Sequence, residues 1–354
     1  MASSSKKTIL IIINNLKSGG TQNQAVLYAN RLSERYRVMF LVIRGFSEEN
    51  CFFENRLYNS IDVYKIKYKP VPLAMIKLVQ FFFQKEYDLC INFQPVTNLI
   101  GTMLTKLFNP KARVICTIRG DSKESYFGIK LYRSFCNLFW VNSSKISNKL
   151  NAYYGLDAKK IILKYNLVEP KFLNTEFTKH HILHVGRITQ VKNQLELIEA
   201  MSILSMDDKK SIELHFVGAV EDKAYYKNLL IRIKELGLKN IFFHDKTEDI
   251  DSYYRKCELL ILTSLSEGLP NVILEAQAYG IPVISSNVGD ISILIDHRST
   301  GYLYASMNSN ELSENIVHFF SLSEEEKCNM RKAVFSSLIS FSQENNEQFI
   351  ANYL

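Results

Sequence analysis

Two glutamates, Glu267 and Glu275, stand where the sequence predicts a loop that runs into a helix. An apolar run over residues 257–264 predicts a buried parallel strand just before them. Pro270 suits the first turn of the helix, because its missing N–H would have no partner there. Gly280 predicts where the helix ends. In a strand–loop–helix–strand unit, ligands bind at the loop, beyond the carboxyl end of the strand.

These residue types favour recognition of a phosphorylated sugar. The free N–H groups and the dipole of a helix N-terminus both favour an anion, which suggests a diphosphate on the amides of Asn271 and Val272. The carboxylates of Glu267 and Glu275 would then accept hydrogen bonds from sugar hydroxyls. On spacing alone, a solvated loop with two ordinary surface glutamates explains the same residues equally well.

The longer string from Glu267 to Ile284, EGLPNVILEAQAYGIPVI, resembles the signature of the retaining family 4 glycosyltransferases, in which seven residues separate two glutamates. Those enzymes have the GT-B fold, with two facing Rossmann-like domains, parallel sheets and the sugar-nucleotide donor in an interdomain cleft. The resemblance implies an α/β protein of this kind. It also implies a transferase that uses a nucleotide-sugar co-substrate, UDP-sugar being favoured, and needs no metal or other cofactor.

A pair of cations supports the same resemblance. Arg187 and Lys192 lie at the turn between a predicted strand ending at Val185 and an amphipathic helix. Taken alone, they are compatible with two solvated basic residues of a loop. In the family, a matching pair binds the donor diphosphate, and an Arg fork suits phosphate oxygens. We therefore expect Arg187, Lys192 and Glu267 to carry catalysis.

The resemblance implies further donor contacts, most of them through the backbone. Glu267 is expected to hold hydroxyls of the donor sugar and Glu275 those of the ribose. A glycine pair such as Gly19–Gly20 lets the backbone approach a ligand, although such pairs also form plain tight turns. The expected donor-binding residues are Gly19, Gly20, Gly186, Gly218, Lys246, Thr247, Gly268, Leu269, Pro270, Asn271, Val272 and Glu275.

Two places depart from the family pattern. Arg119 follows a predicted strand at a position where many relatives carry a His that reaches toward the donor sugar. It could contact phosphate or an acidic acceptor on the acceptor side, or be a plain surface arginine. Asp290 and Ile293 replace a Gly and a Glu of the family, which predicts altered selection of the donor sugar.

Length and composition fit two domains of moderate size. The chain has 354 residues, of which 47% are hydrophobic and 22% charged, as in a globular protein with a real core. We expect an acceptor-side domain over residues 1–168, joined by a C-terminal helix at about 338–354, and a nucleotide-sugar-binding domain over 169–337. Predicted strands of the first domain are 8–14, 37–43, 61–66, 89–93, 113–118 and 140–144. In the second domain, one predicted strand ends at residue 185, and others span 213–217, 240–243 and 257–264.

Charge divides the chain unevenly. Residues 1–170 hold 25 Lys and Arg against 11 Asp and Glu, whereas the remainder holds 18 against 25. A basic first half indicates an anionic partner. No nucleic-acid-binding pattern is present, so we expect no nucleic acid and favour an anionic membrane surface. The apolar start is too short for a secretory signal and no run is long enough to span a membrane, which predicts a cytoplasmic protein, soluble or peripheral on the inner face of the cytoplasmic membrane.

A predicted helix near residues 71–84 could make that contact. Its apolar residues include Phe81–Phe83, and basic residues are interleaved in and around it. Such a helix can lie in a membrane interface or pack on the sheet as ordinary core. Three adjacent Phe cannot share one helix face, so part of it must be core. A second basic and aromatic stretch covers 129–140. The basic residues of the first stretch are Lys65, Lys67, Lys69, Lys77 and Lys85.

Two other patterns suggest metals but have simpler explanations. His180, His181 and His184 straddle a strand start without acidic or Cys partners, so we interpret them as structural. Asp249-Ile250-Asp251 spells a D-x-D triplet, but it stands where Asp is favoured as a helix cap. The six Cys form no CxxC pair, so no zinc site or disulfide framework is indicated.

The sequence therefore predicts a retaining glycosyltransferase that moves a sugar from a nucleotide-diphosphate sugar to an acceptor. The acceptor expected is a lipid-linked oligosaccharide or a lipopolysaccharide core, in the synthesis of bacterial O-antigen or capsule. Two alternatives remain: a sugar-nucleotide 2-epimerase of the same fold, and a non-catalytic membrane-associated partner subunit. A Rossmann dehydrogenase is not supported, because no G-x-G-x-x-G follows a strand.

Overall fold

A computed structural model describes residues 6–17, 19–44, 53–66, 70–121, 123–171, 178, 180–247, 249–344 and 347–354. Two compact units divide these residues. Unit 1 holds the described residues up to Leu167 together with 347–354, and unit 2 holds those from Val168 to Glu344. Of the residues singled out above, Lys67 and Lys69 lie outside the described residues.

Unit 1 is built on a seven-stranded parallel sheet with the order β3-β2-β1-β4-β5-β6-β7. Its strands are nearly continuous apolar runs, as expected for strands covered on both faces. The order reverses between β1 and β4, so the crossovers leave a switch point there. The strands are β1 (Thr8–Ile13), β2 (Arg37–Val42), β3 (Asp62–Lys65), β4 (Leu89–Phe93), β5 (Arg113–Ile118), β6 (Leu138–Val141) and β7 (Ile161–Leu163).

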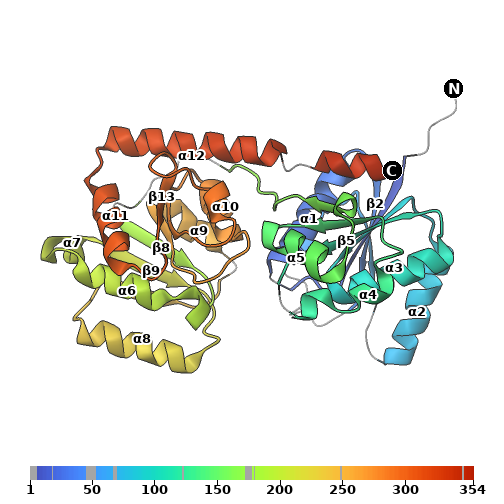
Figure 1. Cartoon of the computed structure of the whole chain (residues 1–354), viewed down its shortest axis with the longest axis horizontal. Coiled ribbons are helices and arrows are strands. Elements are labelled where there is room, and N and C mark those ends of the chain that lie inside the picture. The colour runs from blue at the N-terminus through green and yellow to red at the C-terminus, as the bar shows by residue number, and fades with distance from the viewer. Residues whose placement is uncertain are drawn as a thin grey trace. The chain divides into compact units, whose positions relative to one another are not determined.

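Helices cover both faces of this sheet (Figure 1). One face packs on α2 (Val71–Gln84), α3 (Pro95–Phe108), α4 (Ile129–Tyr132) and α5 (Ser144–Tyr154). The other packs on α1 (Gly20–Ser33) and on the C-terminal 3₁₀ helix η7 (Glu347–Tyr353), which places Phe349 against Trp140. The helix predicted over about 338–354 is wrong as one element. Residues 338–344 end a helix of unit 2, and only the segment from Glu347 packs on unit 1.

Unit 2 is built on a six-stranded parallel sheet with the order β10-β9-β8-β11-β12-β13. The first strand of the unit, β8, again lies at the point where the order reverses. It therefore pairs with β11, although β9 and β10 lie between them in the sequence and 73 residues separate Val185, the last residue of β8, from Leu259, the first of β11. The strands are β8 (His181–Val185), β9 (Glu213–Val217), β10 (Ile241–His244), β11 (Leu259–Leu262), β12 (Val283–Ser286) and β13 (Gly301–Tyr304).

Seven α-helices of unit 2 are described, and they lie on both faces of its sheet (Figure 1). A buried apolar cluster fills the face between the sheet and α6, α8 and α11. The helices are α6 (Gln194–Ile203), α7 (Met206–Ser211), α8 (Lys223–Glu235), α9 (Ile250–Lys256), α10 (Asn271–Gln277), α11 (Ser309–Ser321) and α12 (Glu324–Glu344).

The main differences from the predicted elements occur at the end of unit 1. The strand predicted over 140–144 spans 138–141, because Ser143 caps α5 by accepting a hydrogen bond from the N–H of Ile146. The three-residue edge strand β7 was not predicted. In unit 2 the helix-start prediction for Asp249 is confirmed: its side chain accepts from the N–H of Ser252, capping α9.

Among the described residues, no helix combines the length and the apolar character that crossing a bilayer requires.

Candidate functional site

Three loops meet at the edge of the unit 2 sheet where β8, β11 and β12 end. Because these strands are adjacent, the loops that follow them are neighbours. The N–H of Leu265 donates to the carbonyl of Val191 at 2.9 Å, and the Thr263 hydroxyl donates to the carbonyl of Lys192 at 2.9 Å. The β8 and β11 loops are therefore fastened to each other by their backbones.

Lys192 and Glu267 form an ion pair across these two loops. Lys192 ends the 3₁₀ helix η5 (Gln190–Lys192), and Glu267 lies four residues before α10. Both side chains are mostly covered, with 19% and 13% of their surface exposed. Limited contact with water strengthens electrostatic interactions. The structure thus brings together one of the predicted cations and one of the predicted acids.

The third loop fixes the backbone around Glu267. The N–H of Asp290 donates to the carbonyl of Gly268 at 3.0 Å. Gly289 adopts a positive φ of 61°, and a Cβ there would stand 2.3 Å from the carbonyl oxygen of Glu267. Only glycine accommodates this approach without strain. Asp290 in this loop was predicted to alter selection of the donor sugar, whereas the close approach of Gly289 to Glu267 was not predicted.

Arg187 lies in the β8 loop but has a different environment from Lys192. Its side chain is 63% exposed and donates to Glu221 at 2.8 Å. An ion pair this open to water contributes little to stability, so the guanidinium can exchange partners easily. Glu221 follows β9, and no sequence motif identified it.

Glu275 lies on α10, with its carboxylate accepting a hydrogen bond from the Tyr254 hydroxyl at 3.0 Å. Tyr254 is buried, and burial together with the nearby Glu275 charge raises its pKa well above the usual value. The Tyr254 hydroxyl therefore stays a proton donor to Glu275. Helix α10 ends at Gln277, three residues before the predicted end at Gly280. Gly280 lies in the turn that closes the helix, with φ 69° and an Ile281 N–H that donates to the carbonyl of Ala276.

Gly186 and Gly218 bring two loop backbones into close contact. A Cβ at Gly218 would stand 2.1 Å from the carbonyl oxygen of Gly186. This geometry gives Gly218 a packing role in addition to any donor contact. Of the other two residues predicted near the nucleotide, Lys246 is exposed, and Thr247 accepts from the N–H of Asp249 at 3.1 Å.

His184 is buried directly beneath the cationic loop. Burial, and secondarily the nearby Lys192 charge, lower its pKa to about 3. His181 on the same strand is also buried, and burial plus the neighbouring His215 lower its pKa to about 4. Both imidazoles are therefore neutral at physiological pH. No group of three or more His, Cys, Asp or Glu in the described ranges is arranged to hold a metal ion.

The predicted residues of unit 1 occupy the corresponding edge of the other sheet. Gly19 and Gly20 are exposed at the start of α1, after β1. Arg119 is packed over the Trp140 ring, 4.4 Å from its centroid, and Nη1 donates to Asn166. Burial lowers the pKa of Arg119 to about 10, so it stays charged at neutral pH.

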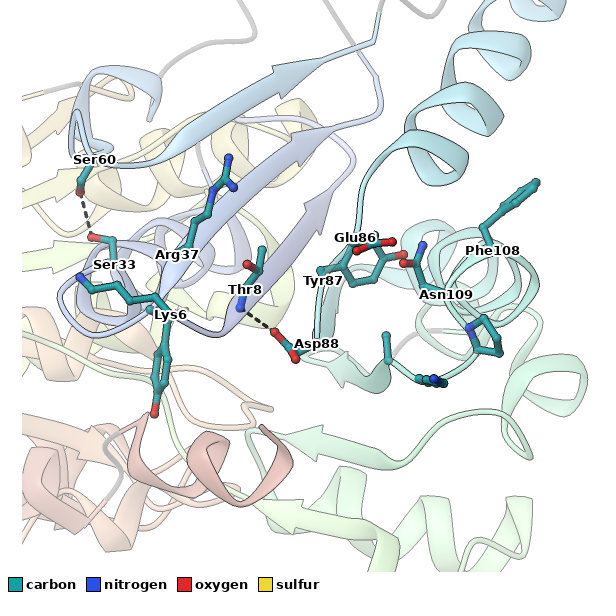
Figure 2. Close-up of a pocket in the computed structure, with 14 residues that line it drawn as sticks. Lys6, Thr8, Ser33, Arg37, Ser60, Glu86, Tyr87, Asp88, Phe108 and Asn109 are labelled. Atoms are coloured by element: carbon teal, nitrogen blue, oxygen red, sulfur yellow. Dashed lines mark hydrogen bonds between the residues drawn. The ribbon is translucent and has the colours of Figure 1, made fainter. Parts of the chain in front are cut away.

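A pocket of about 920 Å³ in unit 1 lies at the opposite edge, where the strands begin. Figure 2 shows Thr8 at the start of β1, donating from its N–H to Asp88, with Arg37 of β2 nearby. None of the predicted site residues lines it. Ligands of doubly wound sheets bind at the carboxyl ends of strands, so this pocket is not the candidate site.

Solved structures with the same arrangement define the fold class. Anabaena HepE in complex with UDP-glucose is similar at a TM-score of 0.75 and 19% identity, over 97% of this chain and 99% of that one. A glycosyltransferase from Rickettsia africae is similar at a TM-score of 0.78 and 18% identity, over 98% of both chains. These likenesses and the two parallel sheets confirm the predicted GT-B α/β fold.

Sequence comparison adds the class of activity. Residues 169–334 match the family described as Glycosyl transferases group 1. A Haemophilus influenzae glycosyltransferase is 26% identical over 328 residues, 88% of this chain and 89% of the relative. The capsular polysaccharide biosynthesis glycosyltransferase CapH of Staphylococcus aureus is 32% identical over 185 residues, 49% of this chain and 51% of the relative.

A third relative is named as the GalNAc-alpha-(1->4)-GalNAc-alpha-(1->3)-diNAcBac-PP-undecaprenol alpha-1,4-N-acetyl-D-galactosaminyltransferase of Campylobacter jejuni. It is 26% identical over 300 residues, which cover 79% of each chain. Together the comparisons support a GT-B glycosyltransferase, with relatives in the biosynthesis of capsules and other polysaccharides.

Proposed function

We propose that this protein is a retaining glycosyltransferase that moves a sugar from a nucleotide-diphosphate sugar, UDP-sugar being favoured, to a lipid-linked oligosaccharide or lipopolysaccharide-type acceptor. The observation that carries the proposal is the mostly buried pair of Lys192 and Glu267 at the switch point of the unit 2 sheet. A cation and a carboxylate held side by side there can serve the two halves of one donor, its diphosphate and its sugar hydroxyls.

Donor binding would rearrange this pair. Lys192 would turn from Glu267 to the donor phosphates, and Glu267 would be released to accept hydrogen bonds from the sugar. Arg187 is exposed and weakly paired with Glu221, so it can join Lys192 on the phosphates. Glu275, oriented by Tyr254, would hold the ribose hydroxyls.

In the reaction, the bond between the anomeric carbon and the diphosphate oxygen breaks, and its electron pair leaves with the diphosphate. The acceptor hydroxyl attacks the anomeric carbon on the face from which the diphosphate leaves, so the anomeric configuration is retained. The hydroxyl proton passes to the leaving diphosphate. Lys192 and Arg187 would stabilise the negative charge that builds on the leaving group. The positive charge would come from these side chains and not from a metal ion. One such preorganised contact is typically worth about 3–4 kcal/mol.

Charge and the relatives support an acceptor of this kind. The basic first half of the chain suits an anionic acceptor such as a diphosphate-linked lipid. The Campylobacter jejuni relative carries PP-undecaprenol in the name of its acceptor, and CapH is named for capsular polysaccharide. We place the protein in bacterial surface-polysaccharide synthesis on these grounds.

A donor screen tests the proposal. Nucleotide release is measured from a panel of UDP-, GDP-, ADP- and dTDP-sugars, with and without polyprenyl-diphosphate-linked glycans. We expect one UDP-sugar to be consumed, with turnover that depends on a lipid-linked acceptor and a product of unchanged anomeric configuration. Acceptor-independent conversion to an epimeric UDP-sugar would indicate an epimerase instead. Lack of turnover of every donor and acceptor would indicate a non-catalytic subunit.

Removing one cation should slow the enzyme sharply. We expect Arg187→Ala to lower turnover by about 100-fold, because one charge on the leaving diphosphate is lost. Since the Arg187 side chain is 63% exposed, the melting temperature should change little. Lys227→Ala, at an exposed lysine of α8, is the matched control and should retain wild-type turnover. Near-wild-type turnover of Arg187→Ala would remove Arg187 from the mechanism.

A further inference from the structure

The loop that follows β9 is fastened to the loop that follows β8 by their backbones. The N–H of Ile188 donates to the carbonyl of Ala219 at 2.9 Å, and the N–H of Asp222 donates to the carbonyl of Ile188 at 3.2 Å. These bonds continue the parallel pairing of β8 and β9 beyond the ends of both strands. Arg187 and Glu221 stand next to the bonded residues, so the ion pair between them joins two loops that already lie side by side.

Arg187 is anchored at its backbone and open to water at its tip. Gln194 of α6 is fully buried, and its Nε2 donates to the carbonyl of Arg187 at 2.9 Å. The Arg187 side chain is 63% exposed and the Glu221 side chain 48% exposed. Water screens the attraction in an ion pair of this kind, so Arg187 can exchange the carboxylate for another anion while its loop stays in place.

The neighbouring acid of the same loop has a different task. Asp222 accepts a hydrogen bond from the N–H of Tyr225 at 2.9 Å and so caps α8. The Tyr225 hydroxyl in turn accepts from the N–H of Leu195 in α6 at 3.0 Å. Glu221 is therefore the acid of this loop that pairs with Arg187, and a substitution at Glu221 leaves the cap of α8 in place.

Each of the two cations expected on the donor diphosphate is paired with a carboxylate: Lys192 with Glu267, and Arg187 with Glu221. The two carboxylates differ in what they gain when a donor binds. Glu267 would exchange Lys192 for sugar hydroxyls under the proposed function. Glu221 would lose Arg187 and gain only water, to which it is already half exposed. The pair of Arg187 and Glu221 therefore opposes the binding of any ligand whose phosphates take Arg187.

We propose that Glu221 is a positioning residue that competes with phosphate for Arg187: it holds Arg187 before the donor binds and recaptures it as the nucleoside diphosphate leaves. The proposal rests on the proposed function in one respect, because it places Arg187 on the diphosphate. Competition of this kind lowers the affinity for donor and product alike, and it shortens the time that the product stays bound. Release of product limits turnover in many enzymes, so a carboxylate that returns to Arg187 would favour the next cycle.

The test is calorimetric titration of the full chain with UDP and, separately, with inorganic pyrophosphate. Glu221→Gln removes the charge and keeps the size of the side chain. We expect this variant to bind both ligands more tightly than the wild type, by about two- to fivefold, because the strength of an exposed ion pair sets the limit. The inhibition constant of UDP in the turnover assay should fall by the same factor. Damage to a loop weakens binding, so a gain in affinity separates competition from a merely structural role.

A second background shows whether the gain passes through Arg187. In Arg187→Ala, the further change Glu221→Gln should leave the affinities for UDP and pyrophosphate unaltered, because no guanidinium remains to be released. The matched control is Glu235→Gln, which removes a carboxylate from another exposed ion pair of unit 2, with Arg232 at 3.1 Å. This control changes the net charge equally and should bind both ligands like the wild type.

The proposal fails if Glu221→Gln binds UDP and pyrophosphate no more tightly than the wild type. Weaker binding by Glu221→Gln would make Glu221 a ligand of the nucleotide, and an equal gain in the Arg187→Ala background would make its effect one of general charge; either result overturns the competition. Turnover of a sugar donor together with unchanged affinities would sink this inference and leave the proposed function standing. Tighter pyrophosphate binding by Glu221→Gln in a protein that turns over no donor would sink the proposed function and leave the competition standing.

Discussion

The two sheets of this protein share a doubly wound order but present different chemistry where their strands end. In unit 2, Lys192 and Glu267 face each other with a fifth or less of each side chain exposed. In unit 1, the cation at the corresponding edge, Arg119, lies over the Trp140 ring and is bonded to Asn166. One edge holds charges that can change partners, and the other holds a charge that is already packed.

This difference shows how much topology leaves open. A switch point predicts where a ligand can bind, because the loops separate there. Whether a cation is available depends on what packs against it. Aromatic rings around Arg119 engage its guanidinium through cation–π contacts, whereas a flexible lysine beside one carboxylate can exchange that carboxylate for a phosphate. Three measurements can break or sharpen the contrast.

The largest effect should come from unit 2. We expect Lys192→Ala to lower turnover by about 10²–10³-fold, because a preorganised charge on the leaving group is removed. Lys192→Arg keeps the charge and should recover part of that loss. Acceptor-dependent nucleotide release at saturating donor is the measurement. If Lys192→Ala retained most of its turnover, Lys192 would not act on the donor, and the proposed contrast between an available cation in unit 2 and a packed one in unit 1 would fail.

The next largest effect should come from acid, which should destabilise unit 2 more than unit 1, because all seven histidines of the chain lie in unit 2. His181 and His184 have folded-state pKa values lowered to about 4 and about 3, from about 6.5 in the unfolded chain. Their neutral forms favour folding, so this stability is complete above pH 6.5 and is lost as the pH falls toward 4 and 3. Each should cost on the order of 3 kcal/mol by pH 4.

The single tryptophan, Trp140, reports on unit 1 alone. On acidification we expect far-UV circular dichroism to lose signal before Trp140 fluorescence changes. His181→Gln should shift the first transition to lower pH, whereas His318→Gln, at an exposed histidine, should not. A single transition seen equally by both probes, and unmoved by His181→Gln, would contradict a histidine-driven loss of unit 2.

The smallest effect should come from Arg119. We expect Arg119→Lys to destabilise unit 1 by about 1–3 kcal/mol, because a lysine cannot both cover the Trp140 ring and reach Asn166. Its effect on turnover should be smaller than that of Lys192→Ala. Guanidinium unfolding followed by Trp140 fluorescence measures the loss. A large fall in acceptor-dependent turnover with unchanged stability would instead place Arg119 on the acceptor.

Much of the fold could be predicted from local pattern. Strands such as β4 and β5 are short, mostly apolar segments of five and six residues, and their predicted bounds are those observed. Asp249 and Gly280 mark helix ends through side-chain capping and a left-handed backbone, both local effects. The edge strand β7 was not predicted, because three half-buried residues are too few to show the hydrophobic pattern of a strand. The C-terminal element was misjudged, because helical spacing cannot tell one helix from two.

The sequence by itself determined which residue types follow which strands, and hence that cations and carboxylates would gather at the ends of the second sheet. Only the tertiary structure decided their partners: Lys192 with Glu267, Arg187 with Glu221, and Glu275 with Tyr254. Those pairs join residues 21 to 75 positions apart. Spacing along a chain encodes the period of a strand or helix, whereas contacts between loops depend on how whole strands are ordered in the sheet.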